Sequence, residues 1–318
     1  MGKRSSDSES LPQTFRSPPP LPPPPQVPES WFPWLTPLIF AVNVAMFVYS
    51  LYENDCPATR SNPDECLFYE YLDRYSFQPL SENPFLGPST TTMIKLGALQ
   101  RKLVVNGEPW RLFSCMWLHA GVIHLVVNML SLLFIGIRLE QEFGFFRLGP
   151  LYVFSGFGGS LASSLYANPA VPVSVSGTLV SVGASGALFG LLGAMLSELL
   201  TNWTIYANKC ASLFILIIVI VLNLALTLIP KVDGSAHIGG FIAGFLLGFI
   251  LLMRPQFGYM SKKYIPPGCN RKYKKSKYQL YQYILLVSAL GILLAGYAIG
   301  LTMLFNGKTI GRFRNASQ

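Results

Sequence analysis

The sequence predicts an all-α membrane protein that crosses the bilayer several times. Hydrophobic residues make up 51% of its 318 residues and charged residues only 12%, about half the ~25% of an ordinary soluble domain. Mean hydropathy is +0.41 despite 24 prolines and a polar N-terminal tail, so the apolar residues are concentrated in long runs. Seven such runs occur, and most reach the ~20 residues that a helix needs to cross a bilayer. These observations exclude a soluble enzyme.

The expected helices follow the apolar runs in chain order: residues 33–52, 118–137, 148–168, 177–200, 211–230, 236–253 and 280–304. A long polar segment, 53–117, separates the first two runs, and a basic loop, 254–278, separates the last two. The expected organisation is therefore a six-span core over residues 31–253, a seventh membrane helix over residues 279–305 and a short C-terminal tail over residues 306–318.

Residues 1–30 are expected to form a disordered, proline-rich cytosolic tail. Serine-rich polar sequence is followed by a run of prolines over residues 16–25, a composition that favours polyproline II. The spacing of Arg16, Pro19 and Pro22 fits a ligand of a proline-binding partner, and a stiff tether is the alternative. The tail lacks the apolar core of a signal peptide, and its acidic residues argue against a transit peptide.

The net charge of +9 is concentrated in residues 254–278, which hold eight lysines and arginines and no acidic residue. A loop of this kind between apolar runs is typical of a cytosolic segment that contacts anionic lipid head groups. Nucleic-acid binding is not expected, because no nucleic-acid motif accompanies the loop. Six crossings then place the N-terminus in the cytosol as well, and residues 53–117 outside it. We expect a secretory-pathway membrane, whether Golgi, endomembrane or plasma membrane.

None of the five cysteines forms a CxxC pair, so the sequence indicates neither a metal site nor a dithiol redox motif. Cys56 and Cys66 lie ten residues apart in the polar segment. They would form a disulfide if that segment faces an oxidising lumen, and two free thiols are the alternative.

Polar side chains inside the apolar runs mark the candidate functional residues, because such groups are costly in lipid. These residues are His119, His124 and Asn128 in the second run, Ser185 in the fourth and His237 at the start of the sixth. In the expected topology all of them lie toward the exterior ends of their helices, and His124 and Asn128 share one helix face. Each alone has a structural explanation, such as a serine that bonds the backbone one turn earlier or glycines that allow close helix packing.

The depths of Ser185 and His237 conflict if the fourth helix begins at residue 177. Ser185 would then lie ~12 Å along its helix, whereas His237 lies at the very start of its own. The conflict disappears if residues 177–184 are irregular and the helix begins near Ser185. Irregular backbone at that depth requires a watery cavity. Ser185 would then stand at a helix N-terminus in a site open to the exterior.

Together these residues resemble the rhomboid intramembrane serine proteases, and the flanking sequence is similar to the plant rhomboid-like branch of that family. Residues 183–186 fit the GxSG motif, and residues 236–244 fit the AHxxGxxxG motif. The other matching positions are Gly183 and Gly186 beside the serine, Gly240 and Gly244 after the histidine, His119, His124 and Asn128 in an HxxxxHxxxN pattern, Trp110 and Arg111 in the first exterior segment, and Glu140 with Gly144 closing the second run. The resemblance covers residues 33–253 and implies a six-helix rhomboid core plus one C-terminal transmembrane helix.

The resemblance implies a Ser–His dyad in which Ser185 is the nucleophile and His237 is the general base and acid. Asp233 lies four residues before His237, so a triad is conceivable, but an ordinary loop aspartate is the preferred interpretation. The backbone N–H of Ser185 and the side chains of Asn128 and His124 would bind the oxyanion. The implied substrates are transmembrane segments of single-pass proteins, cut near their exterior ends, and neither a metal nor an organic cofactor is implied.

Two other functions are kept as alternatives. A catalytically inactive rhomboid relative would bind membrane clients and control their trafficking, but Ser185 and His237 are both present. A small transporter or channel would need paired charges or broken helices in both halves, and the sequence shows no such internal repeat.

Overall fold

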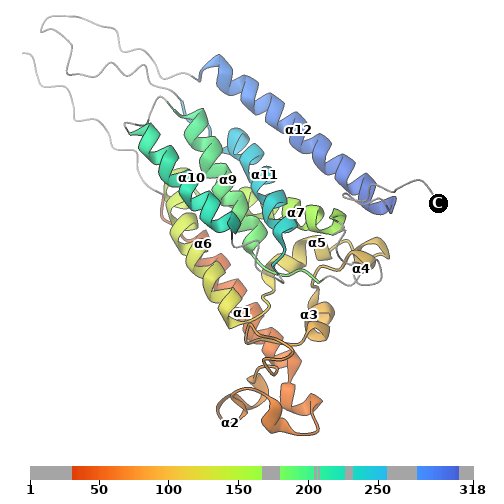
Figure 1. Ribbon diagram of the computed structural model, residues 1–318. Helices are drawn as coiled ribbons and strands as arrows, with labels where there is room; N and C mark the ends of the chain where they lie inside the picture. Colours follow the sequence, from red (N-terminus) through yellow and green to blue (C-terminus); the bar gives the residue numbers. More distant parts are fainter. Residues whose placement is uncertain are drawn as a thin grey trace, which may run out of the picture. The chain divides into compact units, whose positions relative to one another are not determined.

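The computed structural model of the protein describes residues 31–166, 180–203, 206, 208–225, 232–255 and 278–307 (Figure 1). The expected proline-rich tail, nearly all of the basic loop and residues 308–318 lie outside the described residues. The described residues form helices and contain no strand, since their β-structure is limited to isolated bridges such as the one between Leu67 and Phe77. The predicted all-α class is confirmed.

Each of the seven apolar runs contains one long helix. In chain order the long helices are α1 (Leu35–Asn54), α6 (Val122–Phe143), α7 (Phe145–Leu165), α9 (Ser185–Thr201), α10 (Lys209–Ala225), α11 (Gly234–Leu251) and α12 (Leu280–Phe305). Among the described residues, α6, α11, α12 and the stretch Leu35–Thr59 are long and apolar enough to cross a membrane by length and composition. α9 and α10 are apolar but shorter, with 17 residues each. The helices therefore belong to a polytopic integral membrane protein.

The polar segment between α1 and α6 folds into short helices. They are η1 (Cys56–Thr59), η2 (Pro63–Glu65), α2 (Tyr69–Leu72), η3 (Asp73–Tyr75), α3 (Thr90–Leu96), α4 (Arg101–Val105), α5 (Arg111–Ser114) and η4 (Cys115–Trp117). A disulfide joins Cys56 to Cys66, one of the two states that the sequence allowed for this pair. In Figure 1 the orange α2 lies beyond the end of α1, whereas α3 lies beside α1.

Two helices begin four or more residues after the starts of their apolar runs. The second run is expected from residue 118, but α6 begins only at Val122, because Gly121 before it is fully extended with φ and ψ both 177°. The fourth run begins at residue 177, but its helix begins at Ser185, as the depth argument requires. There Gly183 has a φ of +129°, a left-handed conformation that does not continue a helix.

Glu140 is fully buried in α6 and caps the start of α1. Its carboxylate oxygens accept hydrogen bonds from the N–H groups of Leu35 and Thr36 and from the Thr36 hydroxyl, each at 2.7 Å. A carboxylate is stabilised at a helix N-terminus because the free N–H groups and the helix dipole both point toward it. This motif residue therefore joins the first long helix to the second.

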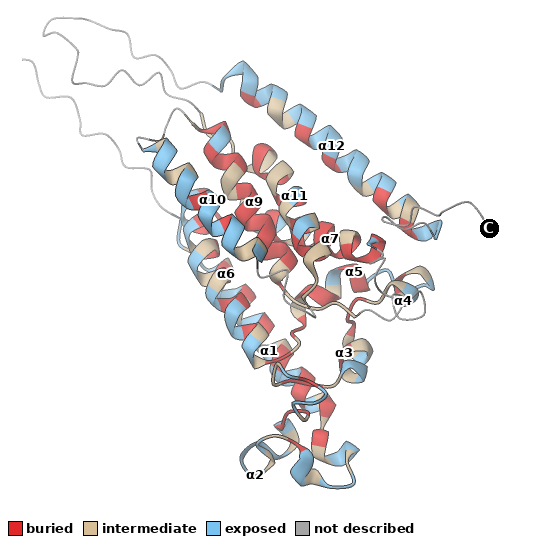
Figure 2. Cartoon of the chain, in the orientation of Figure 1, coloured by how far each residue is buried: buried red, intermediate tan, exposed pale blue. Residues whose placement is uncertain are grey.

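α7, α9 and α11 are largely buried (Figure 2), and glycines bring the backbones of α9 and α11 together. A Cβ atom at Gly240 would lie 2.0 Å from the carbonyl oxygen of Gly186, and one at Gly244 would lie 2.0 Å from that of Gly190. No larger residue fits these two positions of α11 without a shift of the backbone. In lipid, close packing of small residues is a main source of helix association.

A polar cluster joins the ends of α9 and α11 to the start of α12. The Asn202 amide donates to Glu198 Oε1 at 3.0 Å and accepts from the N–H of Arg254 at 3.0 Å. Gln282 on α12 donates to the Arg254 carbonyl at 2.9 Å. Asn202 is consequently buried and bonded through both atoms of its amide, although residues 202–204 have the sequence of a glycosylation acceptor.

Replacing Gly244 by Ala should destabilise the protein, because the added methyl group would press on the Gly190 carbonyl. Overpacking of this kind costs about 1–3 kcal/mol, so the unfolding temperature in detergent should fall by several degrees. The matched control is Gly291→Ala on α12, where an added Cβ would meet nothing within 4 Å among the described residues. Equal unfolding temperatures for the two variants would contradict the packing argument.

Candidate active site

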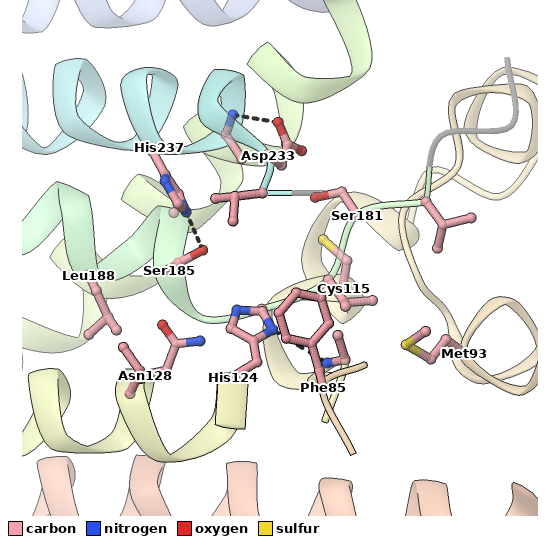
Figure 3. A pocket seen from close by; sticks show the side chains of 18 of the residues that line it. Phe85, Met93, Cys115, His124, Asn128, Ser181, Ser185, Leu188, Asp233 and His237 are labelled. Carbon is pink, nitrogen blue, oxygen red and sulfur yellow. Dashed lines mark hydrogen bonds between the residues drawn. The ribbon is translucent and has the colours of Figure 1, made fainter. Parts of the chain in front are cut away.

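Ser185 is the first residue of α9 and lies on the wall of a cavity of about 1030 Å³ (Figure 3). Side chains from α6, α9 and α11 line the cavity, together with residues from the segment between α1 and α6. The irregular backbone at residues 180–183 also borders it. This agrees with the rule that irregular backbone at membrane depth lines a cavity or is buried in protein.

Ser185 and His237 come together from two different helices, α9 and α11. Ser185 Oγ and His237 Nε2 are 2.8 Å apart, a hydrogen-bond distance (Figure 3). Ser185 is adjacent to Gly186, and His237 lies one turn before Gly240, the glycine that packs on Gly186. The close approach of the two helix backbones therefore sets the separation of the two polar side chains.

The ring of His237 is stacked on Phe189, a residue that the sequence analysis did not single out. The two ring centroids are 4.3 Å apart, and the ring planes differ by 14°. Phe189 stands four residues after Ser185, so both lie on one face of α9; this spacing is the signal that could have found it. The stack restricts tilting of the imidazole out of the plane in which Nε2 reaches Ser185 Oγ.

Asp233 caps α11 and is not bonded to the imidazole. Its Oδ1 accepts from the N–H of Ala236 at 3.0 Å and from the hydroxyl of Ser235 at 2.6 Å, and its Oδ2 accepts from the hydroxyl of Ser163. His237 Nδ1 is buried and has no hydrogen-bond partner among the described residues. These contacts make the arrangement a Ser–His pair, with Asp233 in the role of a helix cap.

His124 and Asn128 face the cavity from α6, one turn apart. His124 Nδ1 accepts a hydrogen bond from the N–H of Ala120 at 3.4 Å. The proton of the neutral ring is then on Nε2, which lies beside Gly183, close enough that a Cβ there would be 2.9 Å away. Asn128 Nδ2 is buried and has no partner in the described part of the chain. Both side chains therefore present N–H donors near the start of α9.

Gly183 fixes the backbone that leads into Ser185. Its N–H donates to the Cys115 carbonyl at 3.0 Å, and a Cβ atom at this position would lie 2.7 Å from His124 Cε1. The left-handed φ and the neighbouring ring both exclude a side chain here. The structure thus brings the expected Gly183, Ser185, His237, His124 and Asn128 to one place.

The remaining motif residues hold the segment around the cavity. His119 is buried and packs edge-to-face on His124, with ring centroids 5.3 Å apart. Arg111 donates to the carbonyl of Ile94 in α3 at 2.7 Å and to that of Ala98 just after α3 at 2.9 Å, and its guanidinium lies 4.8 Å from the Trp110 ring centroid. These residues, like Glu140, stabilise the fold, and none of them lines the cavity.

The described residues contain no group of three or more His, Cys, Asp or Glu side chains placed to hold a metal ion. The cavity contains instead a hydroxyl hydrogen-bonded to an imidazole, with N–H donors on a neighbouring helix. This combination is suited to nucleophilic attack on a carbonyl carbon, followed by stabilisation of the resulting oxyanion.

Comparison with known proteins gives matches that cover this site. A family model for the Rhomboid domain matches residues 106–254. RHOMBOID-like protein 5 of Arabidopsis thaliana is 56% identical over 98% of this chain and 97% of its own length. Inactive RHOMBOID-like protein 8 of Arabidopsis thaliana is 40% identical over 71% of this chain and 62% of its own. Rhomboid protease GluP of Bacillus subtilis is 35% identical over 48% of this chain and 28% of its own.

Proposed function

The chain belongs to the rhomboid family, and we propose that it is an active member, an intramembrane serine endopeptidase that cuts the transmembrane segments of other proteins. The observation that carries this proposal is the 2.8 Å contact between Ser185 Oγ and His237 Nε2 on the wall of a cavity. The alternative is an inactive member that binds membrane clients, and one relative has the word inactive in its name. The paired hydroxyl and imidazole favour the protease.

In the proposed reaction, Ser185 attacks the carbonyl carbon of the scissile peptide while its proton passes to His237 Nε2. The tetrahedral intermediate collapses when Nε2 returns this proton to the leaving amide nitrogen and the C–N bond breaks. The resulting ester on Ser185 is then hydrolysed: a water molecule gives a proton to Nε2 as its oxygen adds to the acyl carbon, and the acyl C–Oγ bond breaks as Nε2 returns this proton to Ser185 Oγ. Nδ1 keeps its proton throughout, so no carboxylate needs to take part.

The negative charge of the intermediate would be bound by three donors. α9 begins at Ser185, so the N–H of this residue has no carbonyl one turn earlier in the helix to bond. His124 Nε2 and Asn128 Nδ2 supply the other two donors from α6. Donors that are fixed before the reaction stabilise the transition state without further reorganisation.

The proposed substrates are single-pass proteins whose membrane helix unwinds near its exterior end. In an intact helix the scissile carbonyl is hydrogen-bonded and shielded, so glycine or another helix-weakening residue near the cut would expose it. Small side chains would fit best beside Ser185, because Gly156, Gly183 and Gly186 line that part of the cavity.

We propose that the N-terminus is cytosolic and that the site opens to the lumen of a secretory-pathway membrane or to the exterior. The Cys56–Cys66 disulfide supports this orientation, because disulfides persist in oxidising compartments. The basic loop would then meet anionic lipid on the cytosolic face. In this proposal residues 31–253 form the protease core, and α12 adds one crossing.

The protease proposal predicts that Ser185→Ala and His237→Ala each abolish cleavage of a transmembrane reporter while leaving the unfolding temperature close to that of the wild type. The nucleophile is lost in the first variant and its base in the second. A fluorophosphonate probe should label the wild type and not Ser185→Ala, which separates a protease from an inactive relative. Cleavage that survives in Ser185→Ala would refute the proposal.

His124→Ala and Asn128→Ala should each lower turnover without abolishing it, because the backbone N–H of Ser185 still binds the oxyanion. The loss of one such donor typically reduces the rate by about 10²–10³. The measurement is kcat for reporter cleavage in detergent or liposomes. Rates within twofold of the wild type for both variants would remove these residues from the oxyanion site.

The topology can be tested with glycosylation reporters. A sequon appended beyond Gln318 should be glycosylated, while a sequon inserted within the basic loop, residues 254–278, should not, because the proposed orientation places only the first in the lumen. Native Asn202 should stay unmodified and is already bonded in the fold. Modification of the loop alone would invert the orientation, and two unmodified sites would mean that α12 is not a crossing.

A further inference from the structure

The helix that carries His124 begins without a side-chain cap. Gly121 precedes α6 and has no side chain to bond the free N–H groups of the first turn. Two of these groups bond instead to carbonyls some 36 residues upstream in the chain. The N–H of Val122 donates to the Leu86 carbonyl at 2.8 Å, and that of Ile123 donates to the Phe85 carbonyl at 3.4 Å. Residues 83–88, here called the capping loop, therefore replace an ordinary N-cap.

Asn83 holds this loop in shape and attaches it to the start of α6. Its side-chain Nδ2 donates to the Pro88 carbonyl at 2.8 Å and to the Ala120 carbonyl at 2.7 Å, and its Oδ1 accepts from the N–H of Phe85 at 3.0 Å. Asn83 is 8% exposed, so these bonds are largely shielded from water. One amide thus joins both ends of the capping loop to the residue that precedes Gly121.

The contact between the capping loop and α6 is too close to allow side chains at two positions. A Cβ at Gly87 would lie 2.2 Å from the Ala120 carbonyl oxygen, and one at Gly121 would lie 2.0 Å from the Phe85 carbonyl oxygen. The start of α6 therefore cannot move relative to the loop without breaking several hydrogen bonds.

The capping loop is in turn anchored to the disulfide-bonded segment. Its Gly87 carbonyl accepts from the N–H of Gln78 at 3.0 Å, and the Gln78 side chain accepts from Arg60 at 2.9 Å. Arg60 lies between Cys56 and Cys66 in the sequence, inside the loop that the disulfide closes. The position of α6 is thus fixed from outside the helical core.

Asn83 and His124 are connected by hydrogen bonds to one residue between them, Ala120. Asn83 bonds the carbonyl of Ala120, and the N–H of Ala120 donates to His124 Nδ1 at 3.4 Å. The Phe85 ring also lies beside the imidazole in the cavity, with ring centroids 6.4 Å apart (Figure 3). Asn83 therefore affects the two contacts that set the tautomer and the place of the imidazole.

We propose that Asn83 is a positioning residue that holds His124, through Ala120 and the capping loop, so that His124 Nε2 is directed to the oxyanion. This inference rests on the proposed protease function and adds to it a residue outside the family motifs named above. Asn83 acts on the transition state through His124, so its loss should lower kcat and leave KM nearly unchanged.

The test compares reporter cleavage by Asn83→Ala, His124→Ala and the double variant. Asn83→Ala should lower kcat by about tenfold or more, with KM within about twofold of the wild type. The double variant should be within about twofold of His124→Ala, because residues that act through one another give non-additive losses. The matched control is Asn62→Ala, an exposed asparagine of the same segment that caps η2, which should leave kcat unchanged.

Two results would overturn the role of Asn83 and leave the protease proposal intact. One is a double variant whose loss of kcat is the product of the two single losses, and the other is a kcat for Asn83→Ala equal to that of Asn62→Ala. Cleavage by Ser185→Ala would overturn the protease proposal instead. If Asn83→Ala does not fold, Asn83→Asp keeps the acceptor for the Phe85 N–H but loses both donors. Amide hydrogen exchange at Val122 and Ile123 should then be faster than in the wild type, measured in the Ser185→Ala background, and unchanged exchange would overturn the capping role.

Discussion

Gly240 and Gly244 meet the backbone of α9 at a distance that leaves no room for a side chain, and the geometry of the site depends on this approach. Ser185 precedes one of the packed glycines of α9, and His237 lies one turn before Gly240. A wider separation of the helices would move both side chains apart together, because each is carried by a rigid helix. The packing of α9 against α11 therefore sets the 2.8 Å distance between the Ser185 hydroxyl and the His237 imidazole.

The second constraint is the membrane, which makes every unsatisfied backbone group expensive. At the site the regular helix begins only where the chain reaches the cavity, so that α9 starts at Ser185 on the cavity wall. Elsewhere side chains accept hydrogen bonds from the free N–H groups at helix starts. Glu140 caps α1 from the distant helix α6, and Asp233 caps α11 as the residue just before that helix. Charge-assisted hydrogen bonds of this kind contribute about 1.5–3 kcal/mol each.

The residues of the site stand on helices that are fixed in place by different interactions. Ser185 and His237 stand on helices packed through glycine, whereas His124 and Asn128 stand on α6, whose start is bonded to residues 83–88. The nucleophile and its base therefore depend on the helical core, while the α6 donors depend on the segment outside it. This division explains how a long, polar, disulfide-bonded segment contributes to chemistry carried out at helix ends.

The sequence alone determined the class of the protein and the start of α9. Composition and seven apolar runs identify an all-α membrane protein, and the mismatch in depth between Ser185 and His237 requires an irregular segment before Ser185. Both conclusions rest on hydropathy and on helix length, which are local properties of the chain. The family motifs added the names of the residues, and six of them line the cavity.

The tertiary structure decided the rest. It showed that Glu140 caps α1, that Asp233 caps α11, that Phe189 stacks on His237 and that Asn83 bonds the start of α6. Each of these depends on which donor, acceptor or ring the fold places opposite a given side chain. For partners 37 to 104 residues apart, such as Asn83 with Ala120 and Glu140 with Thr36, only the packing of the helices brings them together.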